Sequence, residues 1–96
     1  AADNKRIVYI YSSLKDKNVR KILDILSGKK NIYVILTTID NERAISIEKL
    51  RKTIVKYDIK YKIEPDNLKA LELAYKLKKD GIIIIGGSFY LVNRFL

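Results

Sequence analysis

The sequence predicts an α/β domain of three layers, a Rossmann-like fold in which a mostly parallel sheet has helices on both faces. Four apolar runs with the composition of strands alternate with segments whose apolar residues recur at helical spacing. No linker, repeat or low-complexity segment interrupts this alternation, and 96 residues suffice for one domain but not for two. Strands that alternate with helices of about ten residues are typical of βαβ units, and therefore of a parallel sheet.

The first predicted unit runs from residue 6 to residue 38. Residues 6–11 (RIVYIY) and 32–38 (IYVILTT) are rich in β-branched and aromatic side chains and are expected to be strands. Between them we expect a helix that Asp16 caps and that Gly28 ends in the usual left-handed manner. Its inner face follows the helical period with Val19, Ile22, Leu23 and Leu26.

The second unit begins with a polar loop, residues 39–45, after which Ser46 can cap a helix. The inner face of that helix contains Ile47, Leu50, Ile54 and Tyr57. Residues 60–64 (KYKIE) alternate between polar and apolar side chains. This alternation predicts a shorter strand near the edge of the sheet.

The third helix is expected to start after Pro65, with Asp66 as its cap, and to end at Gly81. Its apolar stripe is wide, so we expect the helix to be well buried. The small side chains of Ala70 and Ala74 would let it approach the sheet closely.

The last stretch, residues 80–96, is predicted to organise the whole domain. Residues 82–85 are four consecutive isoleucines, a pattern that predicts a strand buried on both faces. Gly86 and Gly87 allow a sharp turn, and Ser88 can cap a final helix. Strand, turn and helix start would together form a modest anion site. The alternative is that the glycines only permit the turn and the serine only caps.

Composition excludes several classes of chemistry. The chain has no cysteine and no histidine, so it lacks disulfides, thiolate zinc sites and the commonest general base. We therefore predict no catalytic residue and no metal site in it, and we expect a cytoplasmic protein. No apolar run approaches the roughly 20 residues that a membrane helix needs. The net charge of +9 attracts polyanions, or it reflects solubility alone.

Parallel strands would bring four loops to the carboxyl edge of the sheet, where ligands of open α/β sheets bind. These loops are residues 12–15, 39–45, 64–66 and 86–88. Arg43 lies in the second loop, and its guanidinium can grip a carboxylate or phosphate with two hydrogen bonds. The alternative is a solvent-exposed charge paired with Glu42 or Asp40.

Other residues of the same edge could support an anion. Ser88 and the amides near Gly86 and Gly87 would supply neutral donors, and Lys15 would add positive charge. Lys15 has the alternative of being an ordinary solvated residue beside a helix cap. The chain contains neither the phosphate-loop pattern GxxxxGK[ST] nor the dinucleotide-binding pattern GxGxxG. We therefore expect it to be the binding part of an enzyme and not a complete catalyst.

Three stretches resemble, in order and spacing, the C-terminal domain of folylpolyglutamate synthase and dihydrofolate synthase, in the Mur ligase superfamily. They are YSSLKDKNVRKILDIL, TTIDNERAISIEKL and PDNLKALELAYKLKKDGIIIIGGSFYLVNRFL. The resemblance implies an ATP-dependent ligase that joins L-glutamate to the carboxyl group of a pterin, either folate or dihydropteroate, through an acyl phosphate. It also implies that Arg43 and Ser88 contact the glutamate.

The resemblance further implies that ATP and magnesium bind mainly to an N-terminal ATPase domain that this sequence does not contain, so neither is expected on this chain alone. The Asp-Gly-Ala-His-Asn segment of the family, which would lie with the first strand of the sheet, is also missing. Residues 1–96 are thus expected to be a single-domain fragment that is inactive alone and prone to self-association at an open sheet edge. Asn93 stands where the family usually has a small residue.

Two alternatives remain open. The first is a small basic α/β module that binds nucleic acid or a protein partner, which the net charge suggests. The chain has no RNA-binding aromatic motif, so nucleic acid is not the favoured partner. The second is the C-terminal domain of a cell-wall Mur ligase.

Overall fold

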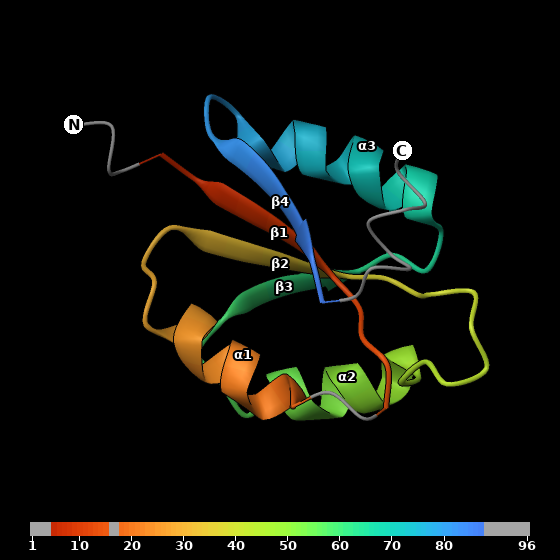
Figure 1. The fold of residues 1–96 in the computed structure, drawn as a ribbon. Coiled ribbons are helices and arrows are strands. Elements are labelled where there is room, and N and C mark those ends of the chain that lie inside the picture. Colours follow the sequence, from red (N-terminus) through yellow and green to blue (C-terminus); the bar gives the residue numbers. More distant parts are fainter. Residues whose placement is uncertain (1–4, 16–17, 88–96) are drawn as a thin grey trace.

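The protein is a parallel four-stranded sheet with strand order β3-β2-β1-β4 (Figure 1). The structure is a computed structural model, and it describes residues 5–15 and 18–87. The elements along the chain are β1 (Ile7–Tyr11), α1 (Val19–Ser27), β2 (Ile32–Leu36), α2 (Ile47–Ile54), β3 (Lys60–Ile63), α3 (Asn67–Lys78) and β4 (Ile82–Gly86). The predicted α/β fold is confirmed, and so is the edge position of β3.

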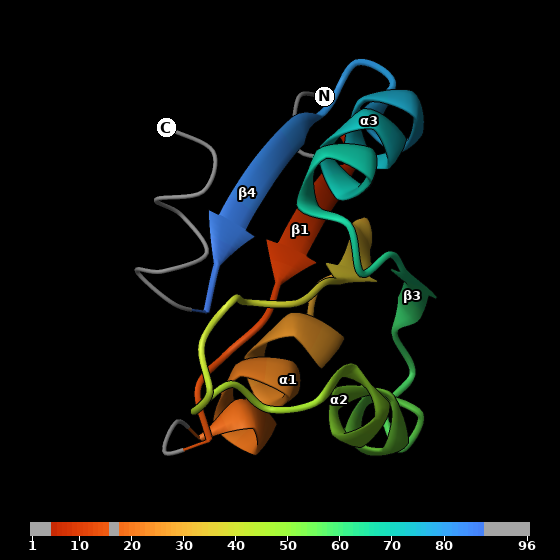
Figure 2. The same ribbon diagram turned by 90° about the vertical axis from the view of Figure 1, so that its right-hand side faces the viewer.

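Helices cover both faces of the sheet, as predicted. Helices α1 and α2 lie together on one face, and α3 lies on the other (Figure 2). Each face has its own core. Ile10 and Ile35 pack with Ala70 and Ala74 beneath α3, whereas Val34 and Leu36 pack with residues of α1 and α2. No helix in the described part of the chain is long and apolar enough to cross a membrane.

The predicted caps of α2 and α3 are confirmed, and the cap of α1 is not the one predicted. Ser46 Oγ accepts a hydrogen bond from Lys49 N at 3.2 Å, and Asp66 Oδ1 accepts one from Lys69 N at 3.0 Å. Helix α1 is capped by Asn18, whose Oδ1 accepts from Lys21 N at 3.1 Å. Asp16 stands two residues before that cap and lies outside the described residues.

Two glycines act differently from the prediction. Gly28 follows α1 with φ −80°, in the right-handed region, so no left-handed cap ends this helix. At the end of α3 the left-handed residue is Lys79, with φ 52°. Gly81 instead allows a close approach of two chain segments, since a Cβ there would lie 1.8 Å from the carbonyl oxygen of Arg6.

The prediction that α3 is well buried holds only for its small residues. Ala70 and Ala74 are fully buried against the sheet, which confirms the close approach. Leu68 is 68% exposed, and Tyr75 is exposed as well. The wide apolar stripe therefore extends beyond the surface that the sheet can cover.

The prediction that β4 is buried on both faces is wrong. Strand β4 is an edge strand that pairs only with β1 among the described strands. Ile83 and Ile85 pack toward α3, but Ile82 and Ile84, on the other face, are 54% and 38% exposed. The reason is the reach of the helices, because α1 and α2 pack mainly on the part of the sheet around β2.

Candidate functional site

The loops that follow β1 and β2 lie side by side at the carboxyl edge of the sheet. Lys15 N donates a hydrogen bond to Arg43 O at 2.8 Å, and Ile45 N donates to Ser13 O at 2.9 Å. Leu14 and Ala44 form an isolated antiparallel bridge between these two bonds. This ladder fixes the backbones on which two of the predicted anion-binding side chains, Lys15 and Arg43, are mounted.

A second set of bonds joins the end of β2 to the start of α3. The hydroxyls of Thr37 and Thr38 donate to Pro65 O at 3.2 and 2.8 Å. Asn67 Nδ2 in turn donates to Thr37 Oγ1 at 2.9 Å and to Thr38 O at 3.0 Å. Both threonines were predicted to belong to the strand, but they follow it, and these hydrogen bonds to Pro65 and Asn67 were not predicted. Two consecutive threonines after an apolar run, with Pro65 after the next strand, were their sequence signal.

Gly86, the last residue of β4, and Gly87 after it pack closely against other segments at the same edge. Gly87 has φ 98°, and a Cβ there would lie 2.0 Å from Ser12 O. At Gly86 a Cβ would lie 2.2 Å from the hydroxyl oxygen of Tyr9. Gly87 therefore requires glycine both for space and for its backbone conformation, whereas a Cβ at Gly86 would require the Tyr9 side chain to shift.

The structure places the predicted site residues around the loop of residues 12–15. Arg43 is exposed and lies beside exposed Lys15, at the far end of this loop. Gly87 packs against its near end, at Ser12. Ser88 and the helix predicted after it lie outside the described residues. Their part in the site stays a prediction.

A cavity of about 480 Å³ opens between the end of β2 and the start of α3. It is lined by Thr38, Ile39, Asp40, Pro65, Asp66, Asn67 and Leu68. Its charged lining residues are the carboxylates Asp40 and Asp66, which do not suit an anion. Arg43 and Lys15 do not line this cavity, so the cavity is separate from the predicted anion site.

Ser12 and Tyr11 have buried side chains, and Tyr9 is partly buried beside them. Ser12 Oγ is buried and has no hydrogen-bond partner in the structure, an arrangement that costs free energy unless a further group pairs with it. Burial raises the pKa of Tyr9 above 10.0, because the phenolate would lose its hydration. Burial also raises the pKa of Tyr11, although a hydrogen bond with Ser13 partly opposes this effect.

The described residues offer no ligand set for a metal ion. No three acidic side chains among them lie close enough together to hold one. The sequence has no histidine or cysteine that could replace a carboxylate.

Comparisons with known proteins give the fold a precedent. A structure of Mycobacterium tuberculosis folylpolyglutamate synthase complexed with ADP matches 97% of this chain, with a TM-score of 0.80 and 23% sequence identity. A second structure of that enzyme, complexed with ADP and AMPPCP, matches 90% of the chain with a TM-score of 0.74 and 24% identity. No family model matches the sequence, and no curated protein matches it either.

The chain therefore has the fold of a part of folylpolyglutamate synthase, as the sequence resemblance predicted. It spans 24% and 22% of the length of the two matched chains, so the likeness concerns one portion of a longer enzyme.

Proposed function

We propose that this chain is the glutamate-positioning domain of an ATP-dependent, amide-forming ligase of the folylpolyglutamate or dihydrofolate synthase type. The observation that carries the proposal is the fold likeness, which extends over almost the whole chain. The ordered sequence motifs support it independently, because they assign a substrate-binding role to Arg43. The complete enzyme would join L-glutamate to the carboxyl group of folate or dihydropteroate through an acyl phosphate.

We assign to Arg43 the role of binding the incoming glutamate. A guanidinium binds a carboxylate through two parallel hydrogen bonds and stays charged at all physiological pH values. The ladder between residues 13–15 and 43–45 supports this role, since it restrains the backbone that carries Arg43. Holding the amine of glutamate close to the activated carboxyl would contribute several kcal/mol through proximity alone. Ser88 is assigned as a second ligand of the glutamate by resemblance.

ATP and magnesium do not fit the described residues. These residues include no metal-ligand cluster, and the sequence has no phosphate loop. We therefore derive no step through either group here. In the proposed enzyme they belong to an N-terminal ATPase domain, which would be the first partner of this chain.

The test is reconstitution with that N-terminal portion, followed by measurement of glutamate-dependent ADP release. Arg43→Ala should lower kcat/KM for glutamate by about 100-fold, the cost of losing a charged, bidentate contact. Arg51→Ala is the matched control, because Arg51 is an exposed arginine of α2 paired with Glu48 and not part of the edge. Equal rates for Arg43→Ala and Arg51→Ala would refute the role of Arg43. No glutamate-dependent turnover with the wild-type chain would refute the ligase assignment.

A further inference from the structure

A second cavity lies between α1 and α2, on the side of the sheet away from α3. Its volume is about 250 Å³, and it is lined by Lys15, Asn18, Val19, Arg20, Ile45, Lys49, Leu50 and Thr53. Three of these residues are cations, and no carboxylate is among the described lining residues. Lys15, which lies beside Arg43 at the carboxyl edge, is thus also a lining residue of this cavity.

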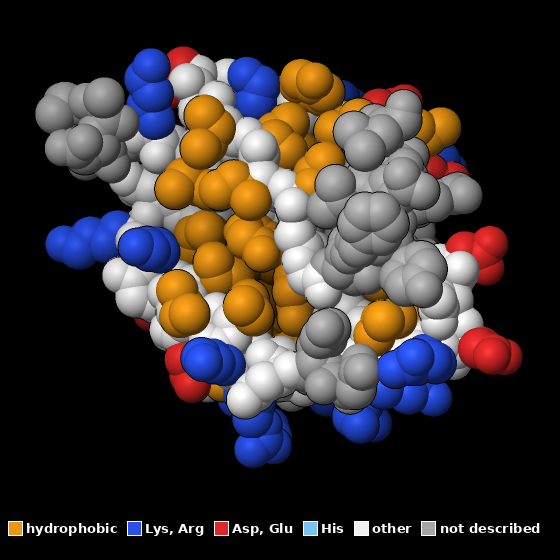
Figure 3. All heavy atoms as spheres, in the orientation of Figure 1, with side chains coloured by type: hydrophobic (Ala, Val, Ile, Leu, Met, Phe, Trp, Pro, Cys, Tyr) orange, Lys and Arg blue, Asp and Glu red, His pale blue; other side chains and the backbone are white. Residues whose placement is uncertain are grey.

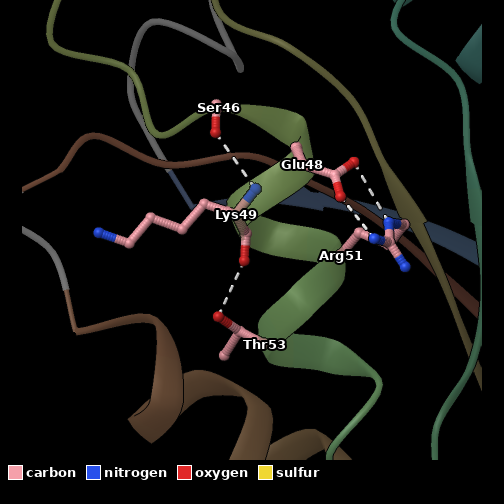
Figure 4. Close-up of polar contacts among 5 residues, drawn as sticks. All are labelled: Ser46, Glu48, Lys49, Arg51 and Thr53. Carbon is pink, nitrogen blue, oxygen red and sulfur yellow. Dashed lines mark hydrogen bonds and ion pairs between the residues drawn. The ribbon is translucent and has the colours of Figure 1, made fainter.

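Among the described residues, no acid lines the cavity. Figure 4 shows the Glu48 carboxylate paired with Arg51 on one side of α2, while the Lys49 side chain extends in the opposite direction. The Arg51 hydrogen bond also lowers the pKa of Glu48, so this acid stays ionised and engaged. On α1 the next acid is Asp24, one turn beyond Arg20, and it does not line the cavity.

The three cations are carried by separate, restrained backbone segments. The Lys15 backbone is bonded to Arg43 O, and the Lys49 amide is bonded to the cap of α2. Thr53 Oγ1 donates to Lys49 O at 2.9 Å, one turn further along α2. Arg20 lies in the first turn of α1, and its carbonyl accepts a bond from Tyr57 at 3.3 Å. The backbone positions of the three cations are thus already fixed before a ligand binds.

The floor of the cavity is apolar. Leu50 is 2% exposed, Ile45 is buried too, and Val19 packs against the same core. A bare inorganic ion gains nothing from such a floor, whereas an organic ligand buries carbon on it at about 25 cal/mol per Å². Cations above an apolar floor are the arrangement that recognises a charged molecule with a hydrocarbon part.

We propose that the cavity between α1 and α2 binds a small organic anion that carries two or more negative charges beside an apolar part. Lys15, Arg20 and Lys49 hold the charges, and Val19, Ile45 and Leu50 contact the apolar part. Arg43 does not line this cavity, although Lys15 lies next to both sites, and the proposal does not depend on the ligase assignment.

The test is an NMR titration of the chain with three probes: adenosine 5′-monophosphate, triglutamate and inorganic phosphate. The first two distinguish phosphate from carboxylate as the source of charge, and the third supplies charge without carbon. We expect amide shifts confined to residues 18–20 and 45–53 for at least one organic probe. We also expect it to bind about tenfold or more tightly than inorganic phosphate.

A charge-matched pair of variants completes the test. Arg20→Gln with Lys49→Gln should weaken the organic probe about tenfold or more, since each loses a charge-assisted contact. Lys69→Gln with Lys76→Gln removes the same charge from exposed positions of α3 and should change binding less than about twofold. Circular dichroism checks that both variants fold.

Three outcomes would overturn the proposal. The first is that neither organic probe, at about 1 mM, shifts the amide signals of residues 18–20 and 45–53. The second is equal binding of inorganic phosphate, which would mean an adventitious ion only. The third is an equal loss of affinity in both double variants, which would show a general effect of net charge. None of these results bears on Arg43, so the ligase proposal stands or falls separately.

Discussion

Strands β2 and β4 are almost equally hydrophobic, but β2 is buried and β4 is partly exposed. The sequence IYVIL of β2 lies between two other strands, and Val34 and Ile35 are completely buried. The sequence IIIIG of β4 lies at the edge of the sheet. Ile82 and Ile84 remain exposed on the face of the sheet that α1 and α2 partly cover, and Figure 3 shows exposed apolar side chains on this face. Hydrophobicity therefore predicted both strands correctly but not their positions in the sheet.

The difference between these strands comes from what covers them. Ile32 of β2 and Ile82 of β4 flank the same residue, Ile7 of β1, in register. Their exposed fractions are 8% and 54%. Since backbone pairing with β1 is the same, the helix layer around β2 accounts for the difference.

The largest effect should come from truncating this matched pair. Ile32→Ala removes buried methyl and methylene groups and should lower the free energy of unfolding by about 2–4 kcal/mol. Ile82→Ala should cost less than about 1 kcal/mol, because much of its side chain is already hydrated. Urea denaturation of both variants measures the two values. Equal losses would show that β4 is covered in solution as β2 is.

The connection into β4 offers the next test. Gly81→Ala places a Cβ 1.8 Å from the Arg6 carbonyl, so the backbone must shift at the start of β4, with a cost of about 1–3 kcal/mol. Gly28→Ala is the matched control: its nearest contact is 3.6 Å away and its φ is −80°. It should be neutral or stabilising by up to about 1 kcal/mol. Thermal unfolding distinguishes the two, and a neutral Gly81→Ala would contradict the close approach.

A pH effect should follow from Tyr9, which pairs in register with Val34 of β2 and Ile84 of β4. Burial raises its pKa above 10.0, so the folded state keeps a proton that the unfolded state releases. The contribution of Tyr9 to stability should be constant well below pH 10.0 and fall as the pH rises through the folded pKa. Tyr9→Phe should make this fall shallower in urea unfolding across the alkaline range. An unchanged slope would place the titration elsewhere, for instance at Tyr11, whose pKa burial also raises.

The smallest effect on stability should come from Ile84→Thr on the open face of β4. Ile84 is partly hydrated already, and threonine keeps the β-branched shape that strands favour, so the change should stay within about 0.5–1 kcal/mol. If the edge of β4 mediates association, this variant should self-associate less than the wild type in sedimentation analysis. A loss of several kcal/mol would mean that this face is part of the core.

The sequence predicted some features of the candidate site and not others. The prediction that the loops of Lys15 and Arg43 meet at one edge is confirmed by the bond from Lys15 N to Arg43 O, whereas the binding roles of these two residues stay predictions. For the glycines the sequence left open an anion site or a turn alone; the described contacts show close packing against Tyr9 and Ser12, and the anion-site role stays a prediction. Sequence reasoning did not find Arg20 and Lys49. They are far apart in sequence, and each resembles the many other exposed charges of its helix.

The sequence by itself determined the alternation of strands and helices, the parallel sheet and, for the three helices that the structure describes, two of the caps, because these depend on local spacing and on short-range hydrogen bonds. Only the tertiary structure decided which isoleucine strand lies at the edge, where Gly81 must remain glycine and which cations line one cavity. Those features depend on which surfaces meet after the chain has folded. A residue's own side chain does not encode what will cover it.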